Sequence, residues 1–381
     1  MTIYSELTAA DRPVRSTPMT GPPTRFEVWD SAAEDDREQW LAAWDRAGGG
    51  EPFSHPDYLD AVLADGESAR CAHWASGGAE IIFAFVSRPI ADAAGNPTGL
   101  TDIITPLVYG GPLGTIHRDG ASRTFWDVMA AWARANSVVS EFIRFSPVDR
   151  LRAPDYPGTL RQQAPHVVRH LDGTDRDAIL AEVGPKVRGK CRKAQRSGLT
   201  IHVDATGEMI EDFVDIYHET MRRVAASDRF FHGRDFFATV NTAFAGRFAY
   251  YYAMSGGRPV SGKLMLYADD VAYDFLSGTR TSELTTGAHV LTCVESMLGS
   301  LDRGVRDHVL TGGVTNSVED SLLQFKRRLA PNGLSHYFTG ERIFLPEIYA
   351  ELSESRVADP GWFPRYRAPV PGVGASTGVQ S

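Results

Sequence analysis

Residues 248–278, FAYYYAMSGGRPVSGKLMLYADDVAYDFLSG, predict three consecutive antiparallel strands. The first two strands meet at a Ser-Gly-Gly turn at 255–257, and the next two meet at the Asp-Asp pair 269–270. Aromatic and apolar runs separated by such short turns are typical of β-hairpins. Residues 72–87, AHWASGGAEIIFAFVS, repeat the arrangement around a second Ser-Gly-Gly turn. The repeat suggests that one sheet-forming unit is duplicated within the chain.

Segments with helical periodicity surround the predicted strands. Apolar residues recur at helical spacing over 209–220, 236–244 and 287–301. The mixture predicts an α/β or α+β fold, in which each half contains a mixed, mostly antiparallel sheet flanked by helices.

The chain has 381 residues, more than one ordinary hydrophobic core accommodates, so we expect two domains. The Pro- and Gly-containing stretch 151–166 indicates the crossing between them. We therefore predict domains at 25–160 and 161–345, with C-terminal elements able to return to the first. The ends, 1–24 and 356–381, lack apolar periodicity and are predicted to be flexible tails.

The formal net charge of −9 argues against a protein that coats nucleic acid or anionic membrane, because such proteins carry a broad positive field. Any anionic partner is therefore expected to bind locally. The three cysteines show no metal-binding spacing, and no apolar run approaches the length of a membrane span. The sequence also lacks the P-loop, the dinucleotide-binding glycine motif and HExxH, and no GxSxG nucleophile elbow follows a predicted strand. We expect a cytoplasmic protein without membrane insertion, a bound metal or another resident cofactor.

Residues 184–198, GPKVRGKCRKAQRSG, gather six cations in this acidic chain and contain no Asp or Glu. If 185–198 is a helix, its buried stripe is Val187, Cys191 and Ala194. A solvated helix face usually carries acids three or four residues from its bases, and here there are none. Two interpretations stay open, a solvent-exposed helix face and a phosphate-binding surface. The cations are Lys186, Arg188, Lys190, Arg192, Lys193 and Arg196.

The segment 102–114, DIITPLVYGGPLG, continues a predicted apolar strand into a Tyr-Gly-Gly sequence. Glycines let a backbone approach a ligand closely, and an aromatic hydroxyl beside them is suited to a substrate pocket. A structural turn is the other interpretation. Asp102 is a candidate base, with a cap or surface group as its alternative role. The candidate substrate-binding residues here are Thr105, Tyr109, Gly110 and Gly111.

The segment 311–331, TGGVTNSVEDSLLQFKRRLAP, places a glycine pair after a predicted strand and before a predicted helix. On the residues alone, Phe325 is most simply a core residue and Lys326 a cation that matches the helix dipole. A functional role for Gly312, Gly313 and this Phe-Lys pair is the alternative.

Together these segments resemble the Fem-type aminoacyl-transferases of the GNAT acyltransferase superfamily. TPLVYGGP at 105–112 resembles the family's TPxxYGGP loop, and KVRGKCRKAQRSG at 186–198 resembles its KxRxxxRKAxxxG helix. FVDIYHETM at 213–221 resembles its F-x-x-x-Y-x-x-T-M helix, and the GG…FK segment is present at 312–326. The resemblance runs from about Pro52 to about Glu351.

The resemblance implies two GNAT-like domains in tandem and an enzyme that transfers an amino acid from aminoacyl-tRNA to an amine. It implies that Lys326 and Phe325 are catalytic, to which we add Asp102, and that Tyr217, Gly312 and Gly313 bind substrate. A fixed cation would stabilise the tetrahedral oxyanion of ester aminolysis. The six cations of 184–198 would bind RNA phosphates, and aminoacyl-tRNA would be a co-substrate. We expect the acceptor to be a small soluble or peptide amine, such as a natural-product intermediate or a cell-wall precursor.

Two other functions stay open. The first is an acyl-CoA-dependent N-acyltransferase, although TRTSELTTGAHVL at 279–291 offers only Gly287 where such enzymes carry a glycine-rich pyrophosphate turn. The second is a binding module without catalytic activity.

Overall fold

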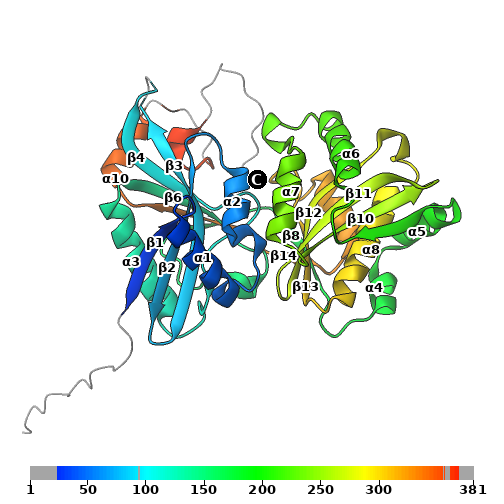
Figure 1. Ribbon diagram of the computed structural model, residues 1–381, viewed down its shortest axis with the longest axis horizontal. Helices are drawn as coiled ribbons and strands as arrows, with labels where there is room; N and C mark the ends of the chain where they lie inside the picture. Colours follow the sequence, from blue (N-terminus) through cyan, green and yellow to red (C-terminus); the bar gives the residue numbers. More distant parts are fainter. Residues whose placement is uncertain (1–23, 93–94, 355, 357–360, 369–381) are drawn as a thin grey trace, which may run out of the picture.

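A computed structural model describes residues 24–92, 95–354, 356 and 361–368. Most of both predicted tails, residues 1–23 and 369–381, lies outside the described residues. The chain forms two sheets that lie side by side, each flanked by helices (Figure 1). The predicted mixed fold with two related units is confirmed.

The first sheet contains seven strands in one path, and a short further strand pairs with its third member. Its path is β1 (Arg25–Asp30), β2 (Ser68–Ser76), β3 (Ala79–Ala91), β4 (Pro97–Ile104), β6 (Val138–Arg144), β15 (Phe338–Ile343) and β7 (Thr159–Gln162), with β5 (Leu113–Gly114) on β3. Its helices are α1 (Glu34–Ala47), α2 (Pro56–Val62), α3 (Ala121–Ala135) and α10 (Pro346–Ser353).

The second sheet repeats this plan with seven strands. Its order is β14 (Leu334–Ser335), β8 (His166–His170), β13 (Asp307–Thr311), β12 (Val271–Thr279), β11 (Arg258–Tyr267), β10 (Phe248–Ser255) and β9 (Thr200–Asp204). Its helices are α4 (Arg176–Glu182), α5 (Pro185–Arg196), α6 (Ile210–Arg223), α7 (Arg234–Ala243), α8 (Ala288–Asp302) and α9 (Ser321–Leu329). Short 3-10 turns lie at Pro52–Ser54, Asp149–Leu151, Asp228–Phe230, Thr281–Glu283 and Arg365–Arg367.

Both predicted hairpins form as the turns indicate. β2 and β3 pair antiparallel across one Ser-Gly-Gly turn, and β10 and β11 pair antiparallel across the other. β12 then pairs antiparallel with β11, as the Asp-Asp turn predicts. Glycines take up the positive φ angles that these tight turns need, 55° and 80° at Gly77 and Gly78.

The second sheet opens at one place. β12 and β13 run parallel and pair only over Val271–Tyr273 and Asp307–Val309. Beyond Tyr273, β12 continues alongside β11, whereas β13 ends and the chain turns toward α9. The two strands therefore part, and a space opens between their carboxyl ends.

The C-terminal chain returns to the first sheet, because β15 pairs with both β6 and β7. Residues 361–368, which fall within the predicted tail, also pack there. Tyr366 is 6% exposed, and its hydroxyl bonds Ser140 and Asp102 at 2.8 and 3.0 Å. These buried hydrogen bonds, whose partners lie far away in sequence, explain why the lack of apolar periodicity did not reveal an ordered segment.

The two halves share one aromatic core. Phe53 from the first half packs edge-on against Tyr273 from β12, with ring centroids 4.9 Å apart. The Tyr273 hydroxyl donates to the buried Glu51 carboxylate at 2.7 Å. In addition, α2 packs against α7 between the sheets (Figure 1). Among the described residues, every helix is too short or too polar to cross a lipid bilayer.

Candidate functional site

A cavity of about 290 Å³ lies where β12 and β13 part. Its walls come from α6, β11, β12, α8, α9 and the turn after β13. The structure brings five of the predicted site residues together around it, namely Tyr217, Gly312, Gly313, Phe325 and Lys326.

The start of α9 is built to hold the Phe-Lys pair against this cavity. Asp320 caps the helix by accepting from the backbone N–H groups of Leu322 and Leu323 at 2.9 and 3.0 Å. Its other oxygen accepts from the backbone of Val314 and Thr315. A Cβ on Gly313 would lie 2.4 Å from the Asp320 carboxylate, so only glycine fits the turn that approaches this cap.

Lys326 is held by neutral acceptors. Its Nζ donates to Thr311 Oγ1 at 2.7 Å and to the Gly312 carbonyl at 2.6 Å. Burial lowers the pKa of Lys326 to about 8. Thr311 adopts a left-handed φ of 64°, which is strained for a β-branched residue. The site thus keeps a half-buried cation whose charge is not neutralised by its hydrogen-bond partners.

A second buried charge lies on the floor of the cavity. Lys263 of β11 forms an ion pair with Asp274 of β12, and both side chains are less than a tenth exposed. Asp274 also contacts His308 Nε2 at 3.2 Å. Burial opposes ionisation of Asp274, but the Lys263 ammonium outweighs it and holds the carboxyl pKa below its ordinary value. This pair is balanced, so the excess charge of the cavity resides on Lys326.

The sequence reasoning missed this pair and the two α8 residues that line the cavity, His289 and Cys293. A signal was present. Lys263 and Asp274 each interrupt an apolar run in strands predicted to be buried, and a charged residue is rarely buried unless it is paired.

The predicted Tyr-Gly-Gly pocket lies between the two sheets instead of in this cavity. Tyr109 is 2% exposed, and its hydroxyl lies 2.6 Å from His166 Nδ1. The His166 ring stacks on Tyr337 with centroids 3.9 Å apart. Thr105 and the glycines belong to the same packed loop, since a Cβ on Gly110 would lie 2.7 Å from the Thr105 methyl. Substrate binding by Thr105, Tyr109, Gly110 and Gly111 stays a prediction.

A second cavity, of about 720 Å³, adjoins the first, because Gly313 lines both. Its polar lining is mainly uncharged and includes Gln162, Gln163, His166, Asn316 and Thr339. A Cβ on Gly312 would lie 2.5 Å from the His166 ring, so the glycine pair keeps the partition between the cavities thin.

Asp102 lies apart from both cavities. Its carboxylate pairs with Arg88 at 2.7 Å and with Arg367 at 2.8 Å, and it is 1% exposed. These contacts join β3, β4 and the C-terminal segment. They favour a structural role, and the role of Asp102 as a base stays a prediction.

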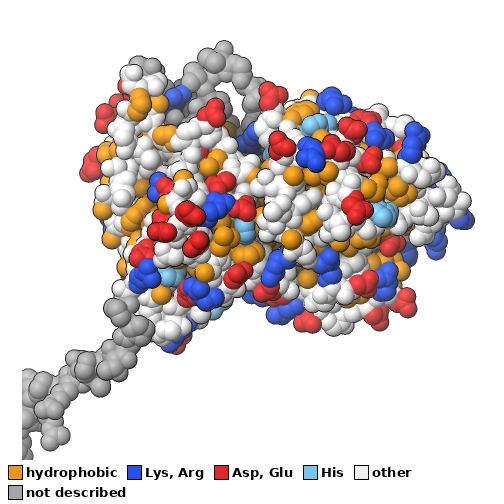
Figure 2. Space-filling model, in the orientation of Figure 1, with side chains coloured by type: hydrophobic (Ala, Val, Ile, Leu, Met, Phe, Trp, Pro, Cys, Tyr) orange, Lys and Arg blue, Asp and Glu red, His pale blue; other side chains and the backbone are white. Residues whose placement is uncertain are grey.

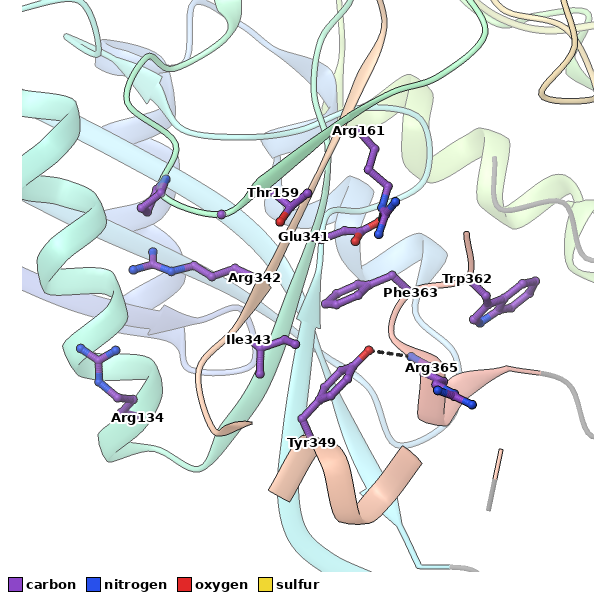
Figure 3. Close-up of a pocket in the computed structure, with 12 residues that line it drawn as sticks. Arg134, Thr159, Arg161, Glu341, Arg342, Ile343, Tyr349, Trp362, Phe363 and Arg365 are labelled. Atoms are coloured by element: carbon purple, nitrogen blue, oxygen red, sulfur yellow. Dashed lines mark hydrogen bonds and ion pairs between the residues drawn. The ribbon is translucent and has the colours of Figure 1, made fainter. Parts of the chain in front are cut away.

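A larger cavity, of about 930 Å³, lies by β15 and α10 in the first half (Figure 3). Arg161, Arg342 and Arg365 line it with Trp362 and Phe363, and the Tyr349 hydroxyl accepts from the Arg365 backbone. It shares Arg161 with the second cavity and contains none of the predicted site residues.

The cationic segment forms α5, with Val187 and Ala194 buried as predicted. Arg188 is used within the fold, because its guanidinium donates to the Leu180 and Ala181 carbonyls at 3.1 and 2.6 Å. The other five cations are exposed, and basic side chains edge the end of the molecule at which α5 lies (Figure 2). They are Lys186, Lys190, Arg192, Lys193 and Arg196.

Residues 185–327 match the family model of the acetyltransferase (GNAT) domain. Most of the chain is similar to the crystal structure of FemX, with a TM-score of 0.63 and 12% identity over 83% of this chain and 98% of FemX. It is also similar to the C-terminal domain of a putative lysylphosphatidylglycerol synthetase from Agrobacterium fabrum, with a TM-score of 0.52 and 11% identity over 80% of this chain and 91% of that one. L-PGS from Bacillus licheniformis gives a TM-score of 0.52 and 14% identity over the same shares. A comparison with curated proteins found no significant match.

Proposed function

Because the chain has the fold of FemX over most of its length and a GNAT domain at 185–327, we propose that it is a Fem-type aminoacyltransferase of the GNAT superfamily. It moves an amino acid from aminoacyl-tRNA to the amine of a small soluble or peptide acceptor and forms an amide bond. The matched GNAT domain supports acyl transfer as the class of reaction.

The observation that carries this proposal is the nearness of α5 to the Lys326 cavity. The Cys191 Sγ of α5 lies 3.9 Å from the Val290 carbonyl oxygen of α8. The residue before Val290 in α8, His289, lines the cavity. Phosphates bound along α5 are therefore one helix away from the site, and an attached ester can enter between β12 and β13. Five exposed cations at one end of an acidic protein suit one local polyanion.

Lys326 supplies the electrostatic part of the reaction. The acceptor nitrogen attacks the ester carbonyl carbon, and the carbonyl oxygen becomes an oxyanion. As the oxyanion collapses, the bond to the ribose oxygen breaks and that oxygen takes up the proton that the nitrogen loses. A half-buried ammonium beside the oxyanion stabilises charge that water would otherwise solvate. Phe325 lines the same wall and excludes water. No covalent enzyme intermediate is required, because the ester is already activated.

The acceptor is assigned to the second cavity. Gly313 is common to both cavities, so an amine placed there approaches the acyl group across the glycine pair. The side-chain amides of Gln162 and Gln163 suit a ligand rich in neutral hydrogen-bonding groups, as a peptide is.

Acyl-CoA is the alternative donor, and one feature favours it. α8 begins after its cap Gly287, and a Cβ at Gly287 would lie 3.1 Å from the Lys190 carbonyl, so the N-terminus of this helix lies beside α5. Helix N-termini bind phosphates, including the pyrophosphate of a nucleotide cofactor.

A binding titration tests the proposal. The ligands are a fluorescent acceptor-stem RNA that carries an amide-linked amino acid, the same RNA without the amino acid, and acetyl-CoA. We expect saturable binding of the aminoacylated RNA that weakens steeply with salt. Saturable acetyl-CoA binding without RNA binding would favour the alternative donor.

A further inference from the structure

His289 is a cavity residue whose hydrogen bonding is incomplete. Its ring stacks on Phe325, with centroids 5.4 Å apart, and lines the cavity that Lys326 also lines. Its Nε2 lies 3.7 Å from Cys293 Sγ. Within the described part of the chain, its Nδ1 is buried and has no hydrogen-bond partner. A buried polar atom without a partner costs about 1–3 kcal/mol, so its retention beside a cavity points to a ligand that completes it.

The imidazole is neutral in the resting protein. Burial, helped by the nearby Lys263 and Lys326 ammonium groups, lowers the pKa of His289 to about 4, and Asp274 opposes this only in part. Arg223 adds to the same positive surroundings. A neutral imidazole carries one N–H, so one ring nitrogen donates and the other accepts.

Cys293 decides which nitrogen donates. Burial raises the pKa of its thiol to about 11, so the sulfur keeps its proton. The Lys263 ammonium beside the sulfur is a donor only. The thiol proton can then be donated to His289 Nε2, and with that hydrogen bond formed the imidazole proton resides on Nδ1.

We propose that His289 is a catalytic residue whose Nδ1–H donates a hydrogen bond to the carbonyl oxygen of the reacting acyl group. Together with Lys326 it forms a two-donor oxyanion site, in which one donor is charged and the other is neutral. The inference rests on acyl transfer in this cavity, which is part of the function proposed above. It holds equally for an aminoacyl ester and for an acyl thioester, because both present a carbonyl oxygen.

The tautomer is tested first, on the full-length protein without any donor. Imidazole ¹⁵N spectra of histidine-labelled wild type are compared with those of His289→Asn, in which the His289 signals are missing. We expect a neutral His289 with Nδ1 protonated at pH 7. An imidazolium, or a neutral ring protonated on Nε2, would overturn the proposal whatever the donor proves to be.

Kinetics then test the contact with the acyl group. We expect His289→Leu to lower kcat by about 10²-fold with the KM for the donor nearly unchanged. His289→Asn, whose amide N–H takes the place of Nδ1–H, should recover most of that loss. A purely structural histidine would not be rescued in this way, so equal losses in both variants would contradict the proposal.

Both donors and a control variant are included. His202→Gln, on the exposed strand β9, should leave both constants unchanged. A wild type that uses acetyl-CoA but ignores aminoacyl-tRNA would refute the tRNA-dependent function. In that case His289→Leu and His289→Asn are compared with acetyl-CoA as the donor, and the comparison still tests the hydrogen bond to the acyl carbonyl oxygen.

Discussion

The two halves of the molecule have the same pattern of strand pairing, but the space where their parallel strands part is filled by a loop in the first half and is a cavity in the second. In the first half, β4 and β6 are parallel, and the loop 105–111 lies along β6 where β4 ends. The Thr105 N–H donates to the Phe142 carbonyl at 3.1 Å, and the Gly110 N–H donates to the Arg144 carbonyl at 2.8 Å. In the second half, the corresponding place beside β13 is the Lys326 cavity.

Each half also pairs a buried carboxylate with a cation on the neighbouring strand. Arg88 and Asp102 pair on β3 and β4, and Lys263 and Asp274 pair on β11 and β12. The first pair is covered by Arg367 and Tyr366 from the C-terminal segment, whereas the second lines a cavity. The equivalent ion pair therefore joins covered structural elements in the first half and lines the candidate site in the second.

The largest effect is expected at Lys326. Lys326→Met removes the cation that stabilises the oxyanion, so kcat for acyl transfer should fall by about 10²- to 10³-fold. The measurement is enzyme-dependent release of labelled amino acid from aminoacyl-tRNA with an amine acceptor present. A folded variant with wild-type turnover would remove the second-half cavity from the reaction.

The matching change in the first half should affect stability and not chemistry. Asp102→Asn leaves Arg88 and Arg367 without their buried counter-charge, which should lower the free energy of unfolding by about 3 kcal/mol. Denaturant titration measures it, with Asp149→Asn at a 70% exposed ion pair as a near-neutral control. Loss of kcat per folded molecule in Asp102→Asn would show that the first half contributes to the reaction.

The cations of α5 should govern RNA affinity. Changing Lys190, Lys193 and Arg196 to Glu should weaken binding of the aminoacylated RNA by about 30-fold. Because up to about three phosphate contacts are lost, the slope of log affinity against log salt concentration should also become less steep. The charge-matched control changes Arg118, Arg123 and Arg134 to Glu in the first half. If both variants weaken RNA binding equally, the effect comes from the net charge of the protein and not from the position of the cations on α5.

The pH dependence should show the smallest effect. Lys326 has a pKa lowered to about 8, so it is charged below that pH and loses its charge as the pH rises through it. The contribution of the cation to kcat should therefore fall by about tenfold between pH 7 and pH 9. Lys326→Arg, which stays charged, should abolish this alkaline decline even if its activity is lower. Persistence of the decline in the arginine variant would assign it to another group.

Local patterns predicted the fold well. Both Ser-Gly-Gly hairpins and the stripe of Val187 and Ala194 on α5 depend on neighbours in sequence, and they form as expected. The grouping of Tyr217 with Lys326 followed from the resemblance to a family, and the structure places both at one cavity.

The parts that were missed depend on contacts distant in sequence. Asp102 looked like a free acid, because one of its two partners, Arg367, lies 265 residues away and the other, Arg88, meets it only across a strand pair. No sequence pattern singled out His289, because Phe325 meets it only after the chain has passed through β13. No pattern of spacing shows that the loop 105–111 lies along β6 in the first half while the equivalent space stays open in the second.

The most direct test is to locate the acyl group itself. An acceptor-stem RNA carrying an amide-linked amino acid with a photoreactive diazirine side chain is crosslinked to the wild type, and the modified peptides are identified by mass spectrometry. We predict crosslinks to cavity residues of the second half, on β12, α8 and α9. Crosslinks confined to the loop 105–111 or to the arginine-lined cavity of the first half would contradict the assignment of the site.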